Sequence, residues 1–403
     1  MSEIKPELRF PEFKDEWENK KLENIADFTK GKLLGKKDLI EKGRYPCILY
    51  GELYTKYGPI INDVVSRTDV NKDELKKGSK NQILIPSSGE TAEDIAIAST
   101  LNTNKDVYIG GDLNILTPKK EDGKFISLSL NGINKWNMAK LAQGKTVVHL
   151  YNNDIKTLNI NLPNKIQEQQ KIGDFFNKLD RQIELEEQKL EKLEEQKKGY
   201  MQQIFSQQLR FKDENGNDYP EWEEKKLGDI LERGNKDKVN EIGKYRRLTI
   251  SLHGKGLYEV KQERKTKDTR PFYQRFEGEL IIGKQNFFNG SIAIVTSEFN
   301  GFICSNAIMS YKISNHMNRK YLLEYLLQND FLRKNEYLAD GTGQKELSEK
   351  KFEELEINLP NSINEQQKIG VFLERLDNLI EKQSNKLELL KQRKKSFLQK
   401  MFV

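Results

Sequence analysis

The chain repeats one long segment of itself, and this repeat constrains the fold more than any other feature. Residues 160–205 align without gaps to residues 357–402, an offset of 197, and 25 of the 46 positions are identical. A shorter repeat precedes each copy: Leu8-Arg9-Phe10 with Trp17 returns as Leu209-Arg210-Phe211 with Trp222. The 403 residues are therefore two tandem copies of one plan, each with a lead-in, a globular region and a terminal helix.

The long repeats follow a heptad pattern, with apolar residues spaced alternately three and four apart, which predicts two coiled-coil helices. The same two seam positions are polar in both copies, Glu186 and Lys197 in the first and Gln383 and Lys394 in the second. Polar seam residues favour one register. About 42 residues predict a helix of about 60 Å. Because like halves of a chain tend to pack about a twofold axis, we expect the two helices to pair antiparallel, with one globular region at each end.

A short motif recurs at the start of each long helix without being required by the seam. It reads Glu-Gln-Gln-Lys in both copies. We predict that it is an exposed patch that binds the same partner twice, with incomplete divergence of the helix surface as the alternative. The predicted partner-binding residues are Glu168, Gln169, Gln170, Glu365, Gln366 and Gln367.

The two globular regions share only a skeleton at the same offset. Residues 83–85 match 280–282, and residues 95–98 match 292–295; both pairs predict short buried strands. Helical stretches are predicted around 126–142 and 318–336. The predicted fold class is α+β, with two globular domains separated by a pair of long antiparallel helices. The predicted boundaries are 1–158, 159–206, 207–355 and 356–403.

Candidate nucleic-acid contacts are found in the predicted loops. Residues 236–275 hold twelve Lys and Arg against five Asp and Glu, including Arg264, with aromatic residues interleaved. Lys, Arg, Asn and Gln bind phosphates or base edges, so these loops are candidates for a DNA interface. A solvated charged loop, and for the histidine a plain surface position, remain alternatives. The candidates are Arg44, Tyr50, Lys56, Tyr57, Ser87, Ser88 and Gly89 in the first region, and Arg246, Arg247, His253, Lys255, Arg270, Lys284, Gln285 and Asn286 in the second.

Composition excludes several other classes of protein. Two cysteines, Cys47 and Cys304, exclude a disulfide scaffold and a cysteine-rich zinc site, and three scattered histidines argue against a histidine metal site. No apolar run approaches the length of a membrane span, and the charged N-terminus predicts no secretory signal. The net charge of +6 permits a polyanionic partner without requiring one. No nucleotide-binding, nuclease or triad motif is complete, so we expect no catalysis by this chain and no metal bound to it.

These features together resemble the specificity (S) subunit of Type I restriction–modification enzymes. The resemblance rests on Ile-Asn-Leu-Pro followed by Glu-Gln-Gln-Lys-Ile and a heptad helix in both copies, on Leu-Arg-Phe-Pro-Glu-Phe at 8–13, and on Gly-Thr-Gly-Gln at 341–344. The first copy departs from the pattern at 143–146, where the glycine-rich turn is looser.

The resemblance implies that each globular region is a target recognition domain that reads half of a bipartite, asymmetric site in double-stranded DNA. It implies that the paired helices set the spacing between the half-sites and dock two methyltransferase subunits, which methylate adenine N6 with S-adenosylmethionine. Two restriction subunits, which use ATP and Mg²⁺, can join them in a prokaryotic cytoplasm. The alternatives are a coiled-coil scaffold with two protein-binding modules, and a stand-alone enzyme with an unfamiliar site.

Overall fold

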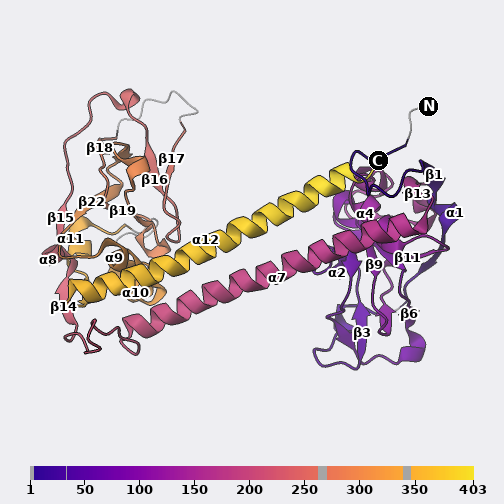
Figure 1. Cartoon of the computed structure of the whole chain (residues 1–403), viewed down its shortest axis with the longest axis horizontal. Helices are drawn as coiled ribbons and strands as arrows, with labels where there is room; N and C mark the ends of the chain where they lie inside the picture. Colours follow the sequence, from indigo (N-terminus) through magenta and orange to yellow (C-terminus); the bar gives the residue numbers. More distant parts are fainter. Residues whose placement is uncertain (1–3, 33, 262–269, 339–345) are drawn as a thin grey trace. The chain divides into compact units, whose positions relative to one another are not determined.

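The computed structural model describes residues 4–32, 34–261, 270–338 and 346–403 (Figure 1). The chain forms two compact units. The first unit comprises Met1–Gln188 and Ser384–Val403, and the second comprises Lys189–Gln383. Each unit is α+β, as predicted, and the two long helices, α7 (Ile166–Phe205) and α12 (Ile363–Lys400), contribute to both. Arg264 and residues 341–344 lie outside the described residues.

The first unit is built on a central five-stranded sheet and a second, four-stranded sheet. The central sheet has the order β2-β11-β7-β9-β4, and the other, which we call the distal sheet, has the order β5-β3-β10-β6. The strands are β1 (Trp17–Lys21), β2 (Ala26–Lys30), β3 (Tyr45–Ile48), β4 (Ile60–Ile61), β5 (Arg67–Thr68), β6 (Lys76–Gly78), β7 (Ile83–Pro86), β8 (Ser88–Gly89), β9 (Ser99–Leu101), β10 (Val107–Ile109), β11 (Leu113–Pro118), β12 (Val148–His149) and β13 (Asn159–Pro163). The helices are α1 (Leu22–Ile25), η1 (Lys36–Asp38), α2 (Glu52–Thr55), η2 (Lys72–Glu74), α3 (Ala92–Ile95), α4 (Gly123–Asn131), α5 (Lys135–Ala139) and α6 (Asn152–Ile155).

The second unit repeats this plan with shorter sheets. Its central sheet has the order β15-β22-β19-β20, the equivalents of β2-β11-β7-β9. The strands are β14 (Glu223–Lys226), β15 (Leu231–Arg233), β16 (Leu248–Ile250), β17 (Leu257–Glu259), β18 (Phe272–Gln274), β19 (Leu280–Gly283), β20 (Ile292–Ile294), β21 (Ile303–Ser305), β22 (Ile308–Ile313) and β23 (Glu356–Leu359). The helices are α8 (Leu227–Ile230), η3 (Ile242–Lys244), η4 (Phe287–Asn289), η5 (Ser297–Phe299), α9 (Arg319–Leu326), α10 (Asn329–Asn335), η6 (Glu336–Leu338) and α11 (Glu349–Glu353).

The predicted strand at residues 95–98 is wrong. Ile95 ends the short helix α3 and the next residues are irregular, although Ile95, Ala96 and Ala98 are buried. The strand equivalent to β20 is β9: Thr100 pairs with Ile83 just as Ile294 pairs with Leu280. The link between the two strands is longer in the first unit, so an ungapped offset of 197 aligned buried apolar residues that serve different roles. The strands at 83–85 and 280–282 and the helices near 126 and 318 are confirmed.

The two long helices run antiparallel within each unit, as predicted. In the first unit Lys394 pairs with Asp180, and in the second Lys197 pairs with Asp377 at 2.7 Å, the same contact repeated at the 197 offset. An edge-to-face ring pair repeats likewise, Phe175 with Phe397 at 5.2 Å and Tyr200 with Phe372 at 5.1 Å. The polar seam residues Lys197 and Lys394 therefore form cross-helix ion pairs that favour one register. The buried apolar seam residues are Ile172, Phe176, Ile183, Ile204, Ile369, Leu373, Leu387, Leu390 and Met401.

The Glu-Gln-Gln-Lys motif is not the exposed patch that was predicted, because its first two residues are buried in both copies. Glu168 and Glu365 are 1% and 0% exposed, and each accepts two hydrogen bonds from the guanidinium of a lead-in arginine, Arg9 or Arg210. Their recurrence therefore has a structural reason: a buried carboxylate is stable only when it is paired.

The buried glutamine beside each glutamate attaches a globular region to its long helix. Gln169 accepts a hydrogen bond from the backbone N–H of Asp122 at 2.9 Å and donates one to the Pro163 carbonyl at 2.8 Å. Gln366 repeats both bonds with Asn318 and Pro360, at 2.8 and 2.9 Å. In both units the side chain thus binds the residue that precedes α4 or α9, and so it places that helix on the long helix.

A glycine in each long helix allows this close packing. A Cβ on Gly173 would lie 2.8 Å from Cβ of Lys124, and one on Gly370 would lie 2.5 Å from Oδ1 of Asn318. Glycine costs about 1 kcal/mol in a helix interior relative to alanine, so its presence at both positions reflects the approach of α4 and α9. Among the described residues, no helix is both long and apolar enough to cross a membrane.

We predict that Glu168→Ala destabilises the first unit by about 3 kcal/mol, because it leaves the mostly buried Arg9 guanidinium without its carboxylate. Urea unfolding followed by tryptophan fluorescence and circular dichroism measures this. The matched control is Glu184→Ala on the same helix, which removes an exposed pair with Arg181 and is expected to cost less than about 0.5 kcal/mol. Equal effects of the two substitutions would contradict the structural role of Glu168.

The ion cluster of Lys197, Lys320, Glu324 and Asp377 predicts a pH dependence of stability. Burial alone raises the pKa of the Asp377 carboxyl, but hydrogen bonds from Lys197 and Lys320 outweigh it and hold this pKa below its ordinary value. A carboxyl with a lowered folded-state pKa stabilises the fold above its unfolded pKa of about 3.9, and this contribution is lost as the pH falls through the folded-state pKa.

Asp377→Asn is therefore expected to lower the free energy of unfolding by about 1 to 2 kcal/mol at pH 7, and by progressively less as the pH falls below about 4. Chemical denaturation at a series of pH values tests this. Asp229→Asn, at an exposed aspartate of the same unit, is the control and should have little effect at any pH. A cost at Asp377 that does not change with pH would show that its charge contributes nothing.

Candidate nucleic-acid interface

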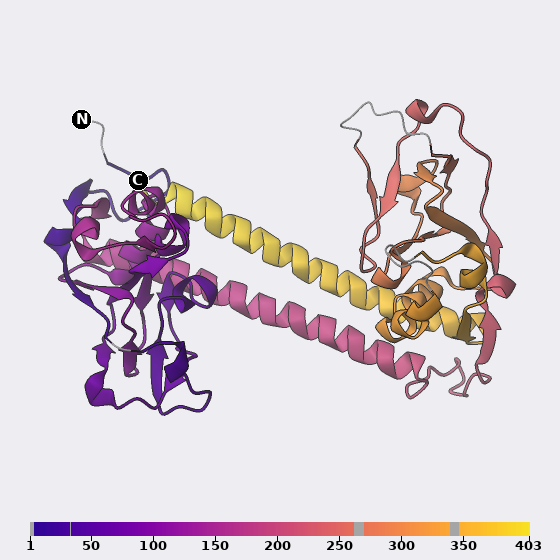
Figure 2. The ribbon, with the colours of Figure 1, turned by 180° about the vertical axis from the view of Figure 1, so that it is seen from behind.

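The two units share the strand order of their distal sheets. The first unit has β5-β3-β10-β6. In the second, β16 pairs with β17, β18 pairs with β21, and a parallel bridge from Arg247 to Ile303 links the two ribbons in the equivalent order, β17-β16-β21-β18. Figures 1 and 2 show both sheets on the sides of their own units away from α7 and α12. The similarity of the two domains thus extends beyond what their sequences indicate.

The distal sheets differ in the connections of their edge strands. Residues 49–66 join β3 to β5 and contain α2 and β4, whereas residues 251–256 join β16 to β17 in a tight turn. The two distal sheets thus share their strand order but differ in the connection to one edge strand. Such a pattern is expected for two modules that recognise different targets, because loops carried on a common scaffold determine what is bound.

The predicted cations of the first unit are already paired within the chain. Arg44 binds Asp69 at 3.2 Å, and Lys56 binds the buried carboxylate of Glu52 at 2.7 Å and the hydroxyl of Ser66 at 3.0 Å. Tyr57 accepts a hydrogen bond from the Val65 backbone, and burial raises the pKa of its hydroxyl. Tyr50 packs against the apolar core that the central and distal sheets share. Lys56, Tyr50 and Tyr57 therefore support the 49–66 connection, and Arg44 remains exposed.

Ser87, Ser88 and Gly89 form part of the framework, and the expectation that they lie in a loop is wrong for Ser88 and Gly89. Ser88 and Gly89 form β8, which pairs with β12. Ser87 and Gly89 are buried, and a Cβ on Gly89 would lie 2.3 Å from Ile95. Of these three residues, only Ser88, which is half-buried, is partly accessible to a ligand.

The predicted equivalence of Ser87 and Lys284 is confirmed by their backbone bonds. The Ser87 carbonyl accepts from Leu150 N–H at 3.0 Å, and that of Lys284 accepts from Leu347 N–H at 3.0 Å. In the second unit, Lys284 borders a polar pocket of about 510 Å³. The pocket is also lined by Lys236, Tyr273, Arg275 and Asn306, among others. Gln285 and Asn286 are exposed beside it. Lys284, Gln285 and Asn286 thus lie together on the surface, whereas their first-unit equivalents do not.

The paired arginines of the second unit differ in their surroundings. Arg246 forms an ion pair with Glu259, which lowers the pKa of that carboxyl, and its guanidinium lies 4.5 Å from the ring centre of Phe302. The Arg247 guanidinium lies 4.5 Å from the ring centre of the buried Phe272. Both arginines therefore help to hold the distal sheet together, and Arg246 does not provide an uncompensated positive charge.

His253 and Lys255 lie in the exposed turn between β16 and β17. Three residues of this turn, His253, Gly254 and Gly256, have positive φ values of 59°, 66° and 81°. Its backbone is fixed by hydrogen bonds from His253 N–H to Asn289 and from Gly254 N–H to Gly290, at 2.8 and 2.9 Å. Lys255 therefore projects from a rigid turn, which fits a contact to DNA. Arg270 is exposed at the start of the segment leading into β18.

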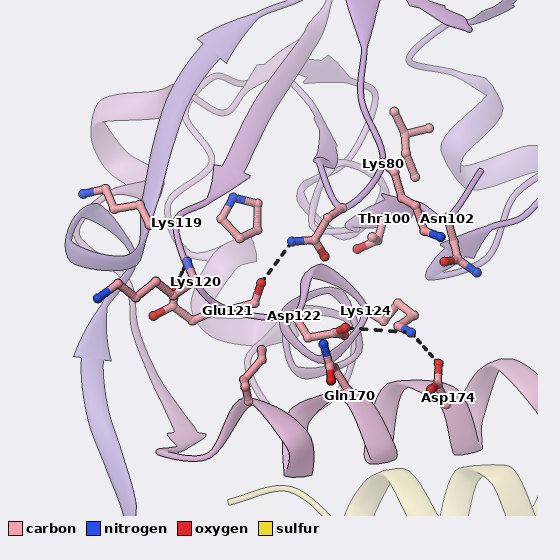
Figure 3. Close-up of a pocket in the computed structure, with 14 residues that line it drawn as sticks. Lys80, Thr100, Asn102, Lys119, Lys120, Glu121, Asp122, Lys124, Gln170 and Asp174 are labelled. Atoms are coloured by element: carbon pink, nitrogen blue, oxygen red, sulfur yellow. Dashed lines mark hydrogen bonds and ion pairs between the residues drawn. The ribbon is translucent and has the colours of Figure 1, made fainter. Parts of the chain in front are cut away.

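A basic pocket of the first unit was not predicted from the sequence. It has a volume of about 690 Å³ and lies between α4, the first turns of α7 and the loop after β11 (Figure 3). Lys80, Lys119 and Lys120 are exposed on its rim, and within the described part of the chain neither Lys80 nor Lys120 has an ion-pair partner. Such lysines can bind phosphate oxygens. The only sequence signal for this pocket was the pair of adjacent lysines at 119 and 120, which directly follow β11 in the structure.

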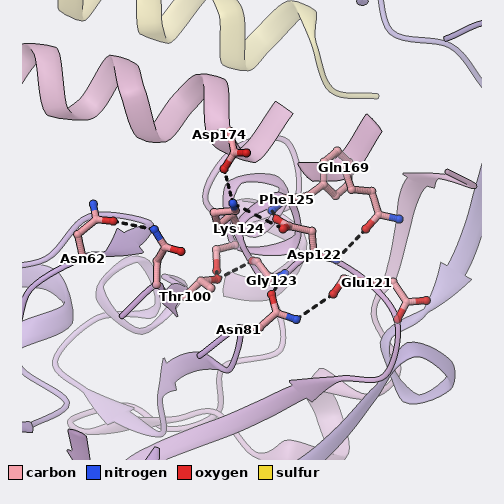
Figure 4. A network of polar contacts seen from close by, with 12 residues as sticks. Asn62, Asn81, Thr100, Glu121, Asp122, Gly123, Lys124, Phe125, Gln169 and Asp174 are labelled. Atoms are coloured by element: carbon pink, nitrogen blue, oxygen red, sulfur yellow. Dashed lines mark hydrogen bonds and ion pairs between the residues drawn. The ribbon is translucent and has the colours of Figure 1, made fainter. Parts of the chain in front are cut away.

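The wall of this pocket is a polar network that connects the central sheet to α7 (Figure 4). Asp122 caps α4 by accepting from Phe125 N–H at 3.0 Å, and Asn81 accepts from Gly123 N–H at 2.7 Å. Lys124 lies between Asp122 and Asp174, and the latter is on α7. Burial raises the pKa of the Asp122 carboxyl. Because Lys124 is neutralised in this network, it positions α4 and is not available to an anion.

Two equivalent grooves are present on the outer faces of the long helices, one in each unit. In the first unit Phe10, Gln170, Lys171, Phe175 and Lys178 line a groove of about 480 Å³. In the second, Phe211, Gln367, Lys368, Phe372 and Arg375 line one of about 700 Å³. The helix residues correspond at the 197 offset. Of the predicted partner-binding residues, Gln170 and Gln367 are exposed here, whereas Glu168, Gln169, Glu365 and Gln366 are buried and cannot contact a partner directly.

No group of three or more histidine, cysteine or carboxylate side chains that could hold a metal ion is found among the described residues. Both cysteines are buried. Burial raises the pKa of the Cys47 thiol to about 11, and burial also raises that of Cys304. These thiols are therefore protonated at neutral pH and are poor nucleophiles.

Comparison with solved structures supports the fold. A crystal structure described as a Type-I restriction-modification system S subunit from M. genitalium matches with a TM-score of 0.67 at 18% identity, covering 99% of both chains. A chain from a structure titled "Structural basis underlying complex assembly and conformational transition of the type I R-M system" matches with a TM-score of 0.51 at 13% identity, covering 96% of this chain and 97% of that one. At these identities the likeness shows the fold alone.

Comparison with protein families agrees with the internal repeat. The family described as "Type I restriction modification DNA specificity domain" matches residues 14–195 and again residues 219–392. These two matches together span most of the sequence, and each contains one globular region with most of its long helix. The chain carries two copies of this domain and therefore belongs to the Type I restriction modification DNA specificity domain family.

Proposed function

We propose that this chain is the DNA specificity subunit of a Type I restriction–modification complex and that each unit reads one half of a bipartite DNA site. One observation carries the proposal: two domains share the strand orders of both sheets and their attachment to the long helices, yet differ at the outer edges of their distal sheets. Family membership supports the role in DNA specificity.

The proposed site is asymmetric because the two readers are unlike. Each half-site alone contributes modest affinity, and connecting the two readers raises the effective concentration of the second once the first has bound. We further propose that α7 and α12, which both pass from one unit into the other, determine the number of base pairs between the half-sites, as dimer geometry does in other DNA-binding proteins.

In this proposal the chain supplies sequence recognition and its partners supply the chemistry. Two methyltransferase subunits bind S-adenosylmethionine and transfer its methyl group to adenine N6. Two restriction subunits, which use ATP and Mg²⁺, join them for cleavage, and the complex acts in a prokaryotic cytoplasm. We place the methyltransferase contacts at the paired grooves. Their support is the matched position of Gln170 and Gln367, and of Lys178 and Arg375, in two units that differ elsewhere.

Mapping of N6-methyladenine in DNA modified by the reconstituted complex tests the proposed function. The expected result is one bipartite sequence with two fixed half-sites and a spacer of constant length. Methylation without sequence preference, or retention of the chain by protein partners but not by any DNA, would instead support a coiled-coil scaffold with protein-binding modules. Methylation by the isolated chain would contradict the proposal that partner subunits, and not this chain, carry out the chemistry.

We predict that one heptad added to both long helices lengthens the preferred spacer. Insertion after Gln188 in α7 and after Gln383 in α12, at the boundary between the units, leaves each unit intact. Seven helical residues add about 10 Å, which corresponds to about three base pairs. Methylation mapping should give a longer spacer with unchanged half-site bases. An unchanged spacer would show that the helices do not set this distance.

We predict that Lys178→Glu and Arg375→Glu each abolish binding of one methyltransferase subunit. Both residues are exposed, line the equivalent grooves, and have no ion-pair partner among the described residues. Light scattering of the assembled complex should show loss of one partner for each single variant and of both for the double variant. Lys192→Glu, an exposed charge reversal elsewhere on α7, is the control and should retain both. If the double variant still bound two methyltransferase subunits, the grooves would be excluded as the binding sites of these subunits.

A further inference from the structure

The edge ribbon of the second unit, formed by β16 and β17, has two faces of opposite character. Leu248 and Ile250 point inward and are buried against the core that contains Ile281, Phe302 and Cys304. Thr249 and Tyr258 are directly opposite each other, and directly opposed residues of antiparallel strands lie on the same face. Tyr258 is 52% exposed, so this pair forms the outward face.

The ribbon is held in position by contacts on its inner face and by hydrogen bonds at its turn. On the inner face Glu259 binds Arg246, whose guanidinium packs on Phe302. At the turn, the backbone bonds of His253 and Gly254 attach the ribbon to the last residue of η4 and to the residue that follows it. A rigid element loses little conformational entropy on binding, so this ribbon is pre-organised to contact a ligand.

The outward face has side chains that the fold itself does not use. Within the described part of the chain, the hydroxyls of Thr249 and Tyr258 have no hydrogen-bond partner, and Lys255 has no ion-pair partner. Tyr245, Leu252, Tyr258 and Val260 are all large apolar residues that are about 40 to 50% exposed. Such a concentration of exposed apolar side chains within sixteen residues indicates a binding surface.

We propose that the β16–β17 ribbon of this chain enters the major groove of double-stranded DNA and reads the bases of one half-site. This inference rests on the proposed function and adds the element and residues that perform it. The major groove is about 12 Å wide and admits a two-stranded ribbon. Thr249 and Tyr258 contact base edges, since a hydroxyl can both donate and accept a hydrogen bond, and Val260 contacts thymine methyl groups.

Lys255 binds phosphate in this arrangement, because it projects from the turn at the tip of the ribbon. The sequence of the turn, Ser251 to Gly256, holds one cation and no carboxylate. A polyanionic partner fits this tip better than a protein partner, whose charged groups are usually of both signs. The corresponding strand pair in the first unit, β3 and β5, has a long connection instead of this turn, so the two domains are expected to read their half-sites by different means.

The experiment uses the full chain assembled with its methyltransferase subunits and compares three variants by methylation mapping and DNA affinity. Tyr258→Ala and Thr249→Val should lower modification of the native site about tenfold, or change the bases preferred, in one half-site only. Lys255→Ala should weaken binding to all sequences alike. It should also reduce the slope of log affinity against log salt concentration by about one, which corresponds to the loss of one phosphate contact. Tyr337→Ala, at a 79% exposed tyrosine outside the ribbon, is the control and should leave both half-sites unchanged.

The outcomes separate this inference from the proposed function. A wild-type complex that methylates a bipartite site, with ribbon variants that fold normally by circular dichroism and keep both half-sites and their affinity, would overturn the ribbon assignment alone. Loss of partner subunits from the ribbon variants with an unchanged methylated sequence would also overturn it, and would identify the ribbon as a protein-binding surface. Absence of any preferred site for the wild type would overturn the proposed function itself.

Discussion

The buried Glu-Gln pair at the start of each long helix is the interaction on which the rest of the architecture depends. Glu168 and Glu365 bind a lead-in arginine, and Gln169 and Gln366 bind the residue that precedes a domain helix. Three segments that are far apart in the sequence therefore meet at one turn of helix. Because buried polar groups are costly unless they are hydrogen-bonded in a specific geometry, the pair favours one placement of each domain on its helix. The glycine four or five residues later allows the close approach that these bonds require.

This attachment explains how the two domains can share a frame while their outer edges differ. The glutamate and glutamine bonds that attach each domain to its long helix repeat in both units, four strands of the central sheets correspond in order, and the distal sheets keep their strand order. The connections at the edges of the distal sheets differ in length, and surface loops tolerate such changes. Recognition can therefore diverge without disturbing either the helices or the grooves beside them. Two domains with unlike outer edges on one duplicated support are a consequence of this separation.

Charge alone is a poor guide to which residues of this chain are free to bind a ligand. Lys56, Arg246 and Lys124 are all basic residues in or near candidate surfaces, yet each is paired with a carboxylate and supports the local fold. Lys80, Lys120 and Lys255, whose side chains have no carboxylate partner among the described residues, are spread over different loops. A cation can attract phosphate only to the extent that no nearby carboxylate already neutralises it. The pairing, which depends on segments remote in sequence, decides which basic residues face a ligand.

The amino-acid sequence by itself determined the duplication, the long helices, their antiparallel pairing within each unit and the α+β class, because these follow from heptad spacing and from repeats visible along the chain. It also matched Ser87 with Lys284, a correspondence that the backbone bonds confirm. Only the tertiary structure decided that Glu168 and Gln169 are buried, that residues 95–98 form no strand, and that the grooves and the basic pocket exist. The physical reason is that burial and pairing depend on which remote segments come together. An ungapped alignment records neither the change in loop length between β7 and β9 nor the partner that neutralises each charge.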